Sequence, residues 1–287
     1  MLTVHNFSYG FLTPVLAYLM SFLGSFLGLR CTSRSRACTG PRRVRWLVVG
    51  GLSIGITGVW VMHFIAMLGF TIPGETIRYS VPITIVSMLV AVIVVTAGLL
   101  IVGFGGVGYR PLLLGGLLTG LGVAAMHYSG MAAMRMPARM SYNAPLFALS
   151  VVIAIGAATA ALWAALRLRG VRATLGAALI MGVAISGMHY TGMAAMHIFP
   201  GGGMAMGGAT AEAFLLPLII GVSVITFLLT ATIALSPTEE EMTAEAELLQ
   251  RIERIRAQTP LTPPLVIRTG RMPRYRHKVM SPMSNRP

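Results

Sequence analysis

The stretch that decides the fold is MHYTGMAAM, residues Met188–Met196. It has a near copy in MHYSGMAAM at Met126–Met134 and a weaker copy in MHFIAM at Met62–Met67. The histidines of the three copies lie 64 and 62 residues apart, each inside an apolar run. The chain therefore contains an internal repeat, and every copy places an ionisable side chain in an apolar segment, which usually marks function.

Composition predicts an integral membrane protein. Of the 287 residues, 55% are hydrophobic and only 10% are charged, with a mean hydropathy of +0.78, whereas soluble domains carry about 25% charged residues. The formal net charge of +14 does not indicate nucleic-acid binding, because of where the basic residues lie. Six fall between Arg30 and Arg45 and nine follow from Arg251 onward, at the flanks of hydrophobic segments, where basic residues fix membrane orientation.

Seven apolar runs are long enough to cross a membrane, since a spanning helix needs about 20 mostly apolar residues. The predicted fold is therefore an all-α, polytopic membrane protein. The seven predicted spans cover residues 10–29, 46–70, 81–103, 111–134, 145–166, 173–196 and 213–235.

Charge in the loops predicts the direction of these spans. The even-numbered loops hold three arginines, Arg78, Arg135 and Arg139. The odd-numbered loops hold more, and the region after the last span is also basic. Because positive loops face the cytoplasm, we expect the N-terminus outside and the C-terminus inside the cell membrane. The odd-loop arginines are Arg30, Arg34, Arg36, Arg42, Arg43, Arg45, Arg110, Arg167, Arg169 and Arg172.

This direction places the three histidines in one layer. Spans two, four and six all run outward, and each histidine lies about seven residues before the outer end, or roughly 10 Å deep. The first six spans thus form a two-helix unit repeated three times, followed by span seven. A polar group at one depth in each repeat is a common way to build a shared site.

Each histidine has methionine partners at helical spacing. Met67, Met131 and Met193 follow a histidine by four residues, on nearly the same helix face. Met134 and Met196 follow by seven and extend the stripe on spans four and six. The methionines that precede the histidines, at 62, 126 and 188, are rotated by about 100°. Imidazole with thioether is a ligand set that suits copper.

A purely structural interpretation is available for each single residue. Methionine fills gaps in cores, and a buried histidine can bond a backbone carbonyl of a neighbouring helix. Three histidines at one depth with the same methionine partner favour a functional site. Tyr128 and Tyr190 are predicted to orient the imidazoles through their hydroxyls, and Ser129 and Thr191 to bond carbonyls of their own helices.

Small residues predict close helix contacts. Glycine pairs four residues apart let membrane helices approach closely, and Gly130, Gly192 and Ala66 leave the histidine face uncrowded. Whether the glycine pairs also produce a homo-oligomer stays open. The pairs are Gly24 with Gly28, Gly51 with Gly55, and Gly116 with Gly120.

The motif resembles the MHYT domain of bacterial integral membrane sensors, over about residues 1–235. The resemblance implies copper ligated near the outer face and detection of oxygen, carbon monoxide or nitric oxide. The first copy departs from the pattern, because Phe64 lacks a hydroxyl and Phe70 replaces the outer methionine. The implied ligands are His63, Met67, His127, Met131, His189 and Met193, with Met62, Met126 and Met188 as additional ones.

The region after the membrane domain 1–235 is predicted to have two parts. Residues 236–258 fit a cytoplasmic amphipathic helix, acidic at its start and basic at its end. Residues 259–287 are proline-rich and basic and are predicted to be disordered, held near anionic lipid or simply solvated. We expect no output domain in this chain, so a signal would pass to a separate cytoplasmic protein.

The leading prediction is a copper-dependent membrane sensor of a diatomic gas or of redox state, with no enzymatic activity. A transporter of copper or another soft cation is the first alternative, although no polar path continues inward. Haem bound by two of the histidines is the second alternative. An intramembrane hydrolase is not expected, because none of the spans contains aspartate or glutamate to act on water.

Overall fold

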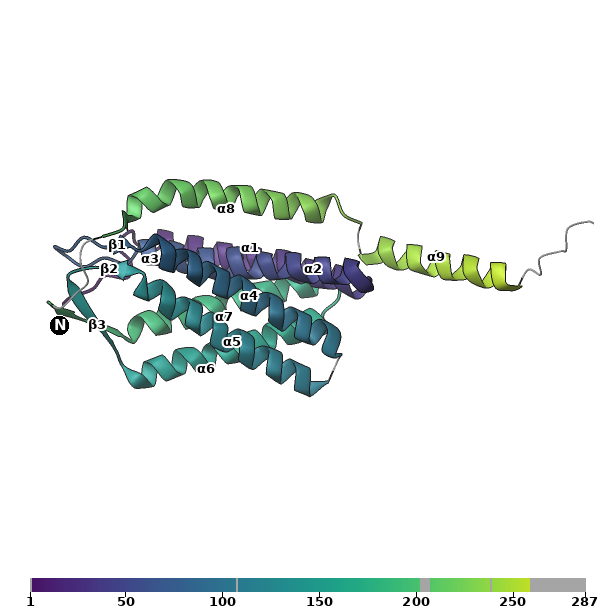
Figure 1. The fold of residues 1–287 in the computed structure, drawn as a ribbon, viewed down its shortest axis with the longest axis horizontal. Helices are drawn as coiled ribbons and strands as arrows, with labels where there is room; N and C mark the ends of the chain where they lie inside the picture. The colour runs from purple at the N-terminus through teal and green to yellow at the C-terminus, as the bar shows by residue number, and fades with distance from the viewer. Residues whose placement is uncertain (1, 107, 202–206, 238, 259–287) are drawn as a thin grey trace, which may run out of the picture. The chain divides into compact units, whose positions relative to one another are not determined.

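The computed structural model describes residues 2–106, 108–201, 207–237 and 239–258, and long helices make up most of it (Figure 1). The second helical stretch is continuous through three segments, α2 (Gly40–Leu52), the π-helical η1 (Ser53–Val61) and α3 (Met62–Leu68). The others are α1 (Leu12–Arg36), α4 (Val81–Gly105), α5 (Tyr109–Ala132), α6 (Ala144–Arg167), α7 (Val171–Ala194), α8 (Ala211–Ala234) and α9 (Glu239–Gln258).

Six helices in the described part are long and apolar enough to cross a membrane. They match the first six predicted spans and make the chain a multi-pass membrane protein. The seventh predicted span forms α8, in which the stretch Ile220–Ala234 is apolar but shorter. A seventh crossing and the orientation therefore stay predictions.

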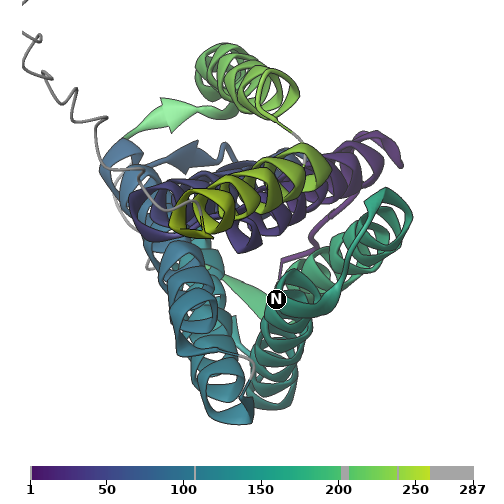
Figure 2. The ribbon, with the colours of Figure 1, turned by 90° about the vertical axis from the view of Figure 1, so that its right-hand side faces the viewer.

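The spanning helices form three pairs arranged as the sides of a triangle (Figure 2). The pairs are α1 with α2–α3, α4 with α5, and α6 with α7, and each pair contacts the next around the ring. Helix α8 lies outside this ring against α1 and η1. The predicted two-helix unit, repeated three times, is present.

Glycines allow the close helix contacts that the sequence predicts. A β-carbon added at Gly24 would overlap the backbone of Gly58 in η1. One at Gly51 would overlap Thr96 of α4, and one at Gly116 would overlap Thr159 of α6. The first glycine of each pair thus lies at a close helix contact, within the first repeat at Gly24 and between neighbouring repeats at Gly51 and Gly116.

The first repeat contains a feature that the sequence did not suggest. Helix η1 has π-helical hydrogen bonding over Ser53–Val61 and ends directly before Met62 and His63. The wider turn shifts the phase of the residues that follow it, and such segments are frequent at functional sites. The irregular copy of the motif therefore begins where the helix geometry is irregular.

The all-α prediction needs a correction at one end of the bundle, here called the strand end. Short strands from the loops pair as β2-β1-β5 and β3-β4. They are β1 (Arg78–Tyr79), β2 (Met134–Arg135), β3 (Ala138–Tyr142), β4 (Met196–Pro200) and β5 (Ala209–Thr210). Met134 and Met196 therefore lie in strands, because α5 and α7 end at Ala132 and Ala194, and the predicted helical stripe stops after its first methionine. Strands this short depend on pairing between loops far apart in sequence, which apolar runs do not encode.

The opposite end, here called the arginine end, differs from the predicted loop assignment. Arg30, Arg34 and Arg36 were expected in the first loop but lie in α1, which runs on to Arg36. Arg34 is only 4% exposed and donates from Nη2 to the Ile233 carbonyl at 2.8 Å and from Nε to the Pro237 carbonyl at 3.0 Å. A cation at the carbonyl end of a helix is favourable. Because α1 continues to Arg36, Arg34 reaches the end of α8 and caps it.

The last described helix, α9, forms where an amphipathic helix is predicted. The described chain divides at Glu245 into the bundle and a second unit. In that unit the apolar side chains of Leu248, Leu249, Ile252 and Ile255 are exposed. What they contact stays a prediction, and the predicted tail 259–287 lies outside the described residues.

Candidate metal centre

The three motif histidines meet in the centre of the bundle. His63 from α3, His127 from α5 and His189 from α7 are at most 1% exposed. The Nδ1 atom of His63 lies 3.1 Å from Nδ1 of His127 and 3.1 Å from Nδ1 of His189. All three ring centroids lie 5.0 Å apart in pairs, with the rings close to perpendicular. The predicted layer of histidines is thus a compact triad.

The triad is held by contacts that run around the bundle. A β-carbon at Gly130 would overlap Nε2 of His63, and one at Gly192 would overlap Nε2 of His127. The histidines of the first and second copies therefore dock on the glycine of the copy that follows. The first copy has Ala66 at the same motif position.

The imidazoles have few other polar contacts. The Nε2 atoms of all three are buried and have no hydrogen-bond partner among the described residues. A neutral imidazole carries one N–H and one lone pair. With each proton on Nε2, three Nδ1 lone pairs converge on one point, which is an arrangement that attracts a cation.

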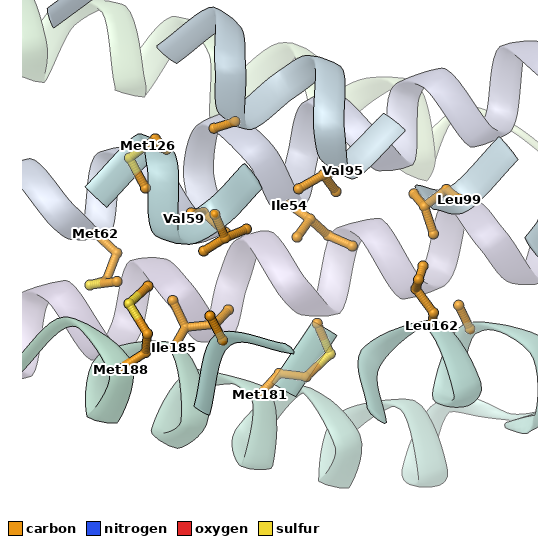
Figure 3. Close-up of a cluster of buried hydrophobic side chains, with 14 of the residues drawn as sticks. Ile54, Val59, Met62, Val95, Leu99, Met126, Leu162, Met181, Ile185 and Met188 are labelled. Carbon is orange, nitrogen blue, oxygen red and sulfur yellow. The ribbon is translucent and has the colours of Figure 1, made fainter. Parts of the chain in front are cut away.

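Methionines form a layer on each side of the triad. Met62, Met126 and Met188 belong to one buried apolar cluster and gather at one end of it (Figure 3). A second buried cluster at the strand end contains the methionines that follow the histidines by four residues, Met67, Met131 and Met193. Each helix therefore carries its histidine between one methionine of the first cluster and one of the second.

The strands close the second cluster. Met134 from β2 and Met196 from β4 are buried in it, as are Tyr79 from β1 and Ile198 from β4. Met136, which was not among the predicted site residues, is also buried there. It lies in a short methionine-rich loop, and helical spacing does not connect that loop to the histidines.

The predicted tyrosine role needs correction. The Tyr128 hydroxyl lies 2.6 Å from Ser150 Oγ on α6, so it does not orient an imidazole. The Tyr190 hydroxyl is buried and has no hydrogen-bond partner in the part of the chain that the structure describes. The predicted bonds of the neighbouring residues are confirmed, since Ser129 Oγ donates to the Met126 carbonyl and Thr191 Oγ1 to the Gly187 carbonyl.

Tyrosines in the strands stay neutral at ordinary pH. Burial raises the pKa of Tyr79 well above its usual value. Burial, together with the nearby Tyr128, raises the pKa of Tyr142 to about 12. The strand end therefore covers the methionine cluster without adding a negative charge from these phenols.

The residues of the triad fit a soft metal ion. Within the described residues, they are the group of histidine, cysteine or carboxylate side chains whose ligand atoms lie close enough for one ion, within 4.8 Å of one another. Nitrogens that ligate one ion at about 2.0–2.1 Å lie no more than about 4 Å apart, a limit that the two 3.1 Å separations from His63 satisfy. Three imidazoles with thioethers nearby favour copper over hard cations, which prefer oxygen.

The fold and the site define a class: a multi-pass membrane protein whose threefold helical repeat encloses a buried histidine triad. The MHYT family, described as "Bacterial signalling protein N terminal repeat", matches the chain three times, over residues 57–116, 120–178 and 182–244. The chain belongs to this family. No solved structure matches it.

Curated relatives are signalling proteins of greater length. The chain is 37% identical over 256 residues to the bifunctional diguanylate cyclase/cyclic di-GMP phosphodiesterase MucR of Pseudomonas aeruginosa. This aligned region covers 86% of this chain and 37% of MucR. It is 41% identical over 200 residues to the cyclic di-GMP phosphodiesterase NbdA of the same organism, covering 67% of this chain and 25% of NbdA. The chain thus spans a quarter to two fifths of these relatives.

Proposed function

We propose that this protein is a membrane-embedded sensor that holds copper at His63, His127 and His189. The observation that carries the proposal is the convergence of their nitrogens, since Nδ1 of His63 lies 3.1 Å from Nδ1 of His127 and of His189. Among the described residues, no carboxylate belongs to this group. A neutral imidazole offers the lone pair that ligates a metal ion. The family and the signalling relatives support the sensor role.

The methionines would complete the ligand set. Met67, Met131 and Met193 are buried on one side of the triad, and Met62, Met126 and Met188 on the other. Thioethers are soft ligands that favour Cu(I). Copper held there would supply a centre that binds a diatomic gas or changes its redox state.

The protein's own part would be to transmit a change in the triad. Each imidazole belongs to a different helix pair, and those of His63 and His127 rest on the next pair through Gly130 and Gly192. A small displacement of one ring must therefore move a neighbouring helix, since packed cores shift between discrete arrangements. We propose that this shift reaches the cytoplasmic end and a separate output protein.

The two alternatives receive less support. A haem between two of the histidines would need their rings to move apart, because the ring centroids are only 5.0 Å from one another. A transporter would need ligands beyond the first methionine cluster, where the described core continues with apolar residues such as Val95, Leu99 and Leu162. Copper uptake into sealed vesicles would nevertheless support transport.

The test is the copper content of purified protein, measured by elemental mass spectrometry together with an absorption spectrum. We expect bound copper and no Soret band in the wild type, and loss of copper in the variant H127A/H189A. The matched control is H5A/H197A, because His5 is exposed and His197 is partly exposed at the strand end. Full copper retention by H127A/H189A would refute the proposal.

A further inference from the structure

The bundle contains an apolar cavity of about 80 Å³ on the side of the triad away from the strands. Its lining comes from η1, α4, α5, α6 and α7, and one of its walls is Met188, the residue before His189. Ile54, Val59, Val95 and Ile185 line the same space (Figure 3). The cavity therefore ends at Met188, next to His189 along α7.

The chemistry of the lining excludes water and ions. Thr119 is the polar side chain in it, and its Oγ1 already bonds the Val94 carbonyl. A buried water needs two to four polar partners, whereas apolar cavities stay dry and bind small apolar molecules such as xenon. A cavity of about 150 Å³ accepts benzene, so the smaller space here suits molecules of a few atoms.

The lining of the cavity reaches the surface at α6 and α7, where Ala160 and Ile180 are exposed, and we place its mouth there. Alanines of α6, among them Ala157, Ala160 and Ala161, form one side of it. On the other side, Ile180 of α7 lines the cavity and is 70% exposed on the bundle surface. That surface is apolar, because Val152 and Val183 are also exposed on these helices. In a spanning bundle this mouth faces lipid hydrocarbon.

We infer that this cavity binds a small uncharged apolar molecule of diatomic size, which enters from the bilayer between α6 and α7 and reaches the triad past Met188. The inference deepens the proposed sensor function and rests on it for the final step to the metal. Methionine side chains are flexible and fill gaps adaptably, so Met188, at the end of the cavity nearest His189, is not a rigid wall.

Xenon is the probe for the cavity itself, because it needs no metal. We expect metal-free protein to show bound xenon by 129Xe NMR, in short-chain detergent and in lipid nanodiscs. The variants A184L and A158L fill the lining from α7 and α6, and both should lose the signal. The control A173L adds the same atoms at an exposed position of α7 and should retain it.

The route is tested by xenon exchange. We expect I180W to slow exchange, because it enlarges the residue at the mouth, while occupancy at saturating pressure stays unchanged. Absence of xenon from the wild type, or retention in both A184L and A158L, would overturn the inference. Binding in detergent but not in nanodiscs would also overturn it, since a lipid chain would then be the occupant.

The failure of the cavity inference and that of the sensor proposal have different signatures. Xenon binding in protein that never retains copper would leave the cavity inference standing and refute the copper site. Conversely, copper-loaded protein that binds carbon monoxide equally fast in wild type, A184L and I180W would support the metal site and refute the route.

Discussion

The Nδ1 atoms of His63 and His189 face each other at 3.1 Å, although 126 residues separate the two histidines along the chain. His63 makes the same contact with His127. The histidine of the irregular first copy is thus central to the triad. Phe64 and Phe70, by which this copy departs from the motif, leave its imidazole as buried as the other two.

The first prediction concerns this histidine. We expect H63A to lose copper as completely as H127A, because three lone pairs converge and each ring contacts both others. Elemental analysis of the two single variants checks this. Retention of copper by H63A alone would mean that the first copy contributes no ligand.

The second prediction concerns the glycine that supports His127. G192A places a β-carbon 2.3 Å from Nε2 of His127, so the ring must move. Displacing a ligand through its supporting shell typically costs about 10- to 100-fold in metal affinity, and we expect a loss of this size in a competitive copper titration. The matched control on the same helix is G187A, where an added β-carbon meets nothing within 4 Å. G187A should retain affinity and be slightly stabilised, because alanine favours helix over glycine. Equal affinity of both variants would contradict the docking role.

The third prediction concerns Arg34 at the arginine end. R34A removes charge-assisted hydrogen bonds to the Ile233 and Pro237 carbonyls and leaves the end of α8 uncapped. Hydrogen bonds from charged groups contribute about 1.5–3 kcal/mol each, so we expect faster amide exchange in the last turn of α8. Hydrogen exchange with mass spectrometry measures this. R30A, at a partly buried position of the same helix, is the comparison and should change exchange in α8 much less.

The fourth prediction concerns alkaline pH. Burial raises the pKa of Tyr142 to about 12, above the ordinary value of 10. A raised pKa means that the folded state disfavours the charged phenolate, so the contribution to stability is complete below pH 10 and is lost as the pH rises towards 12. We expect the melting temperature of the wild type to fall more steeply than that of Y142F between pH 10 and 12. Parallel pH profiles for the two proteins would show that Tyr142 does not contribute.

Much of the site followed from the sequence. Helical spacing placed Met131 and Met193 on the face of their histidines, and both are buried beside the triad. The same spacing failed for Met134 and Met196, because the helices end before them and strands carry them into the cluster. The hydroxyl of Tyr128 was also misassigned, since nothing local to its motif indicates Ser150 on α6 as its partner.

The sequence alone determined the membrane-spanning helices, their threefold pairing and the common depth of the histidines. These properties are encoded locally, by the length of apolar runs and by spacing along a helix of fixed rise. Only the tertiary structure decided that the Nδ1 atoms meet, that His63 and His127 rest on the glycine of the next copy, and that Arg34 of α1 caps α8. The reason is physical: these contacts depend on how separate helices pack, and side chains more than 60 residues apart select one another only once the backbones have come together.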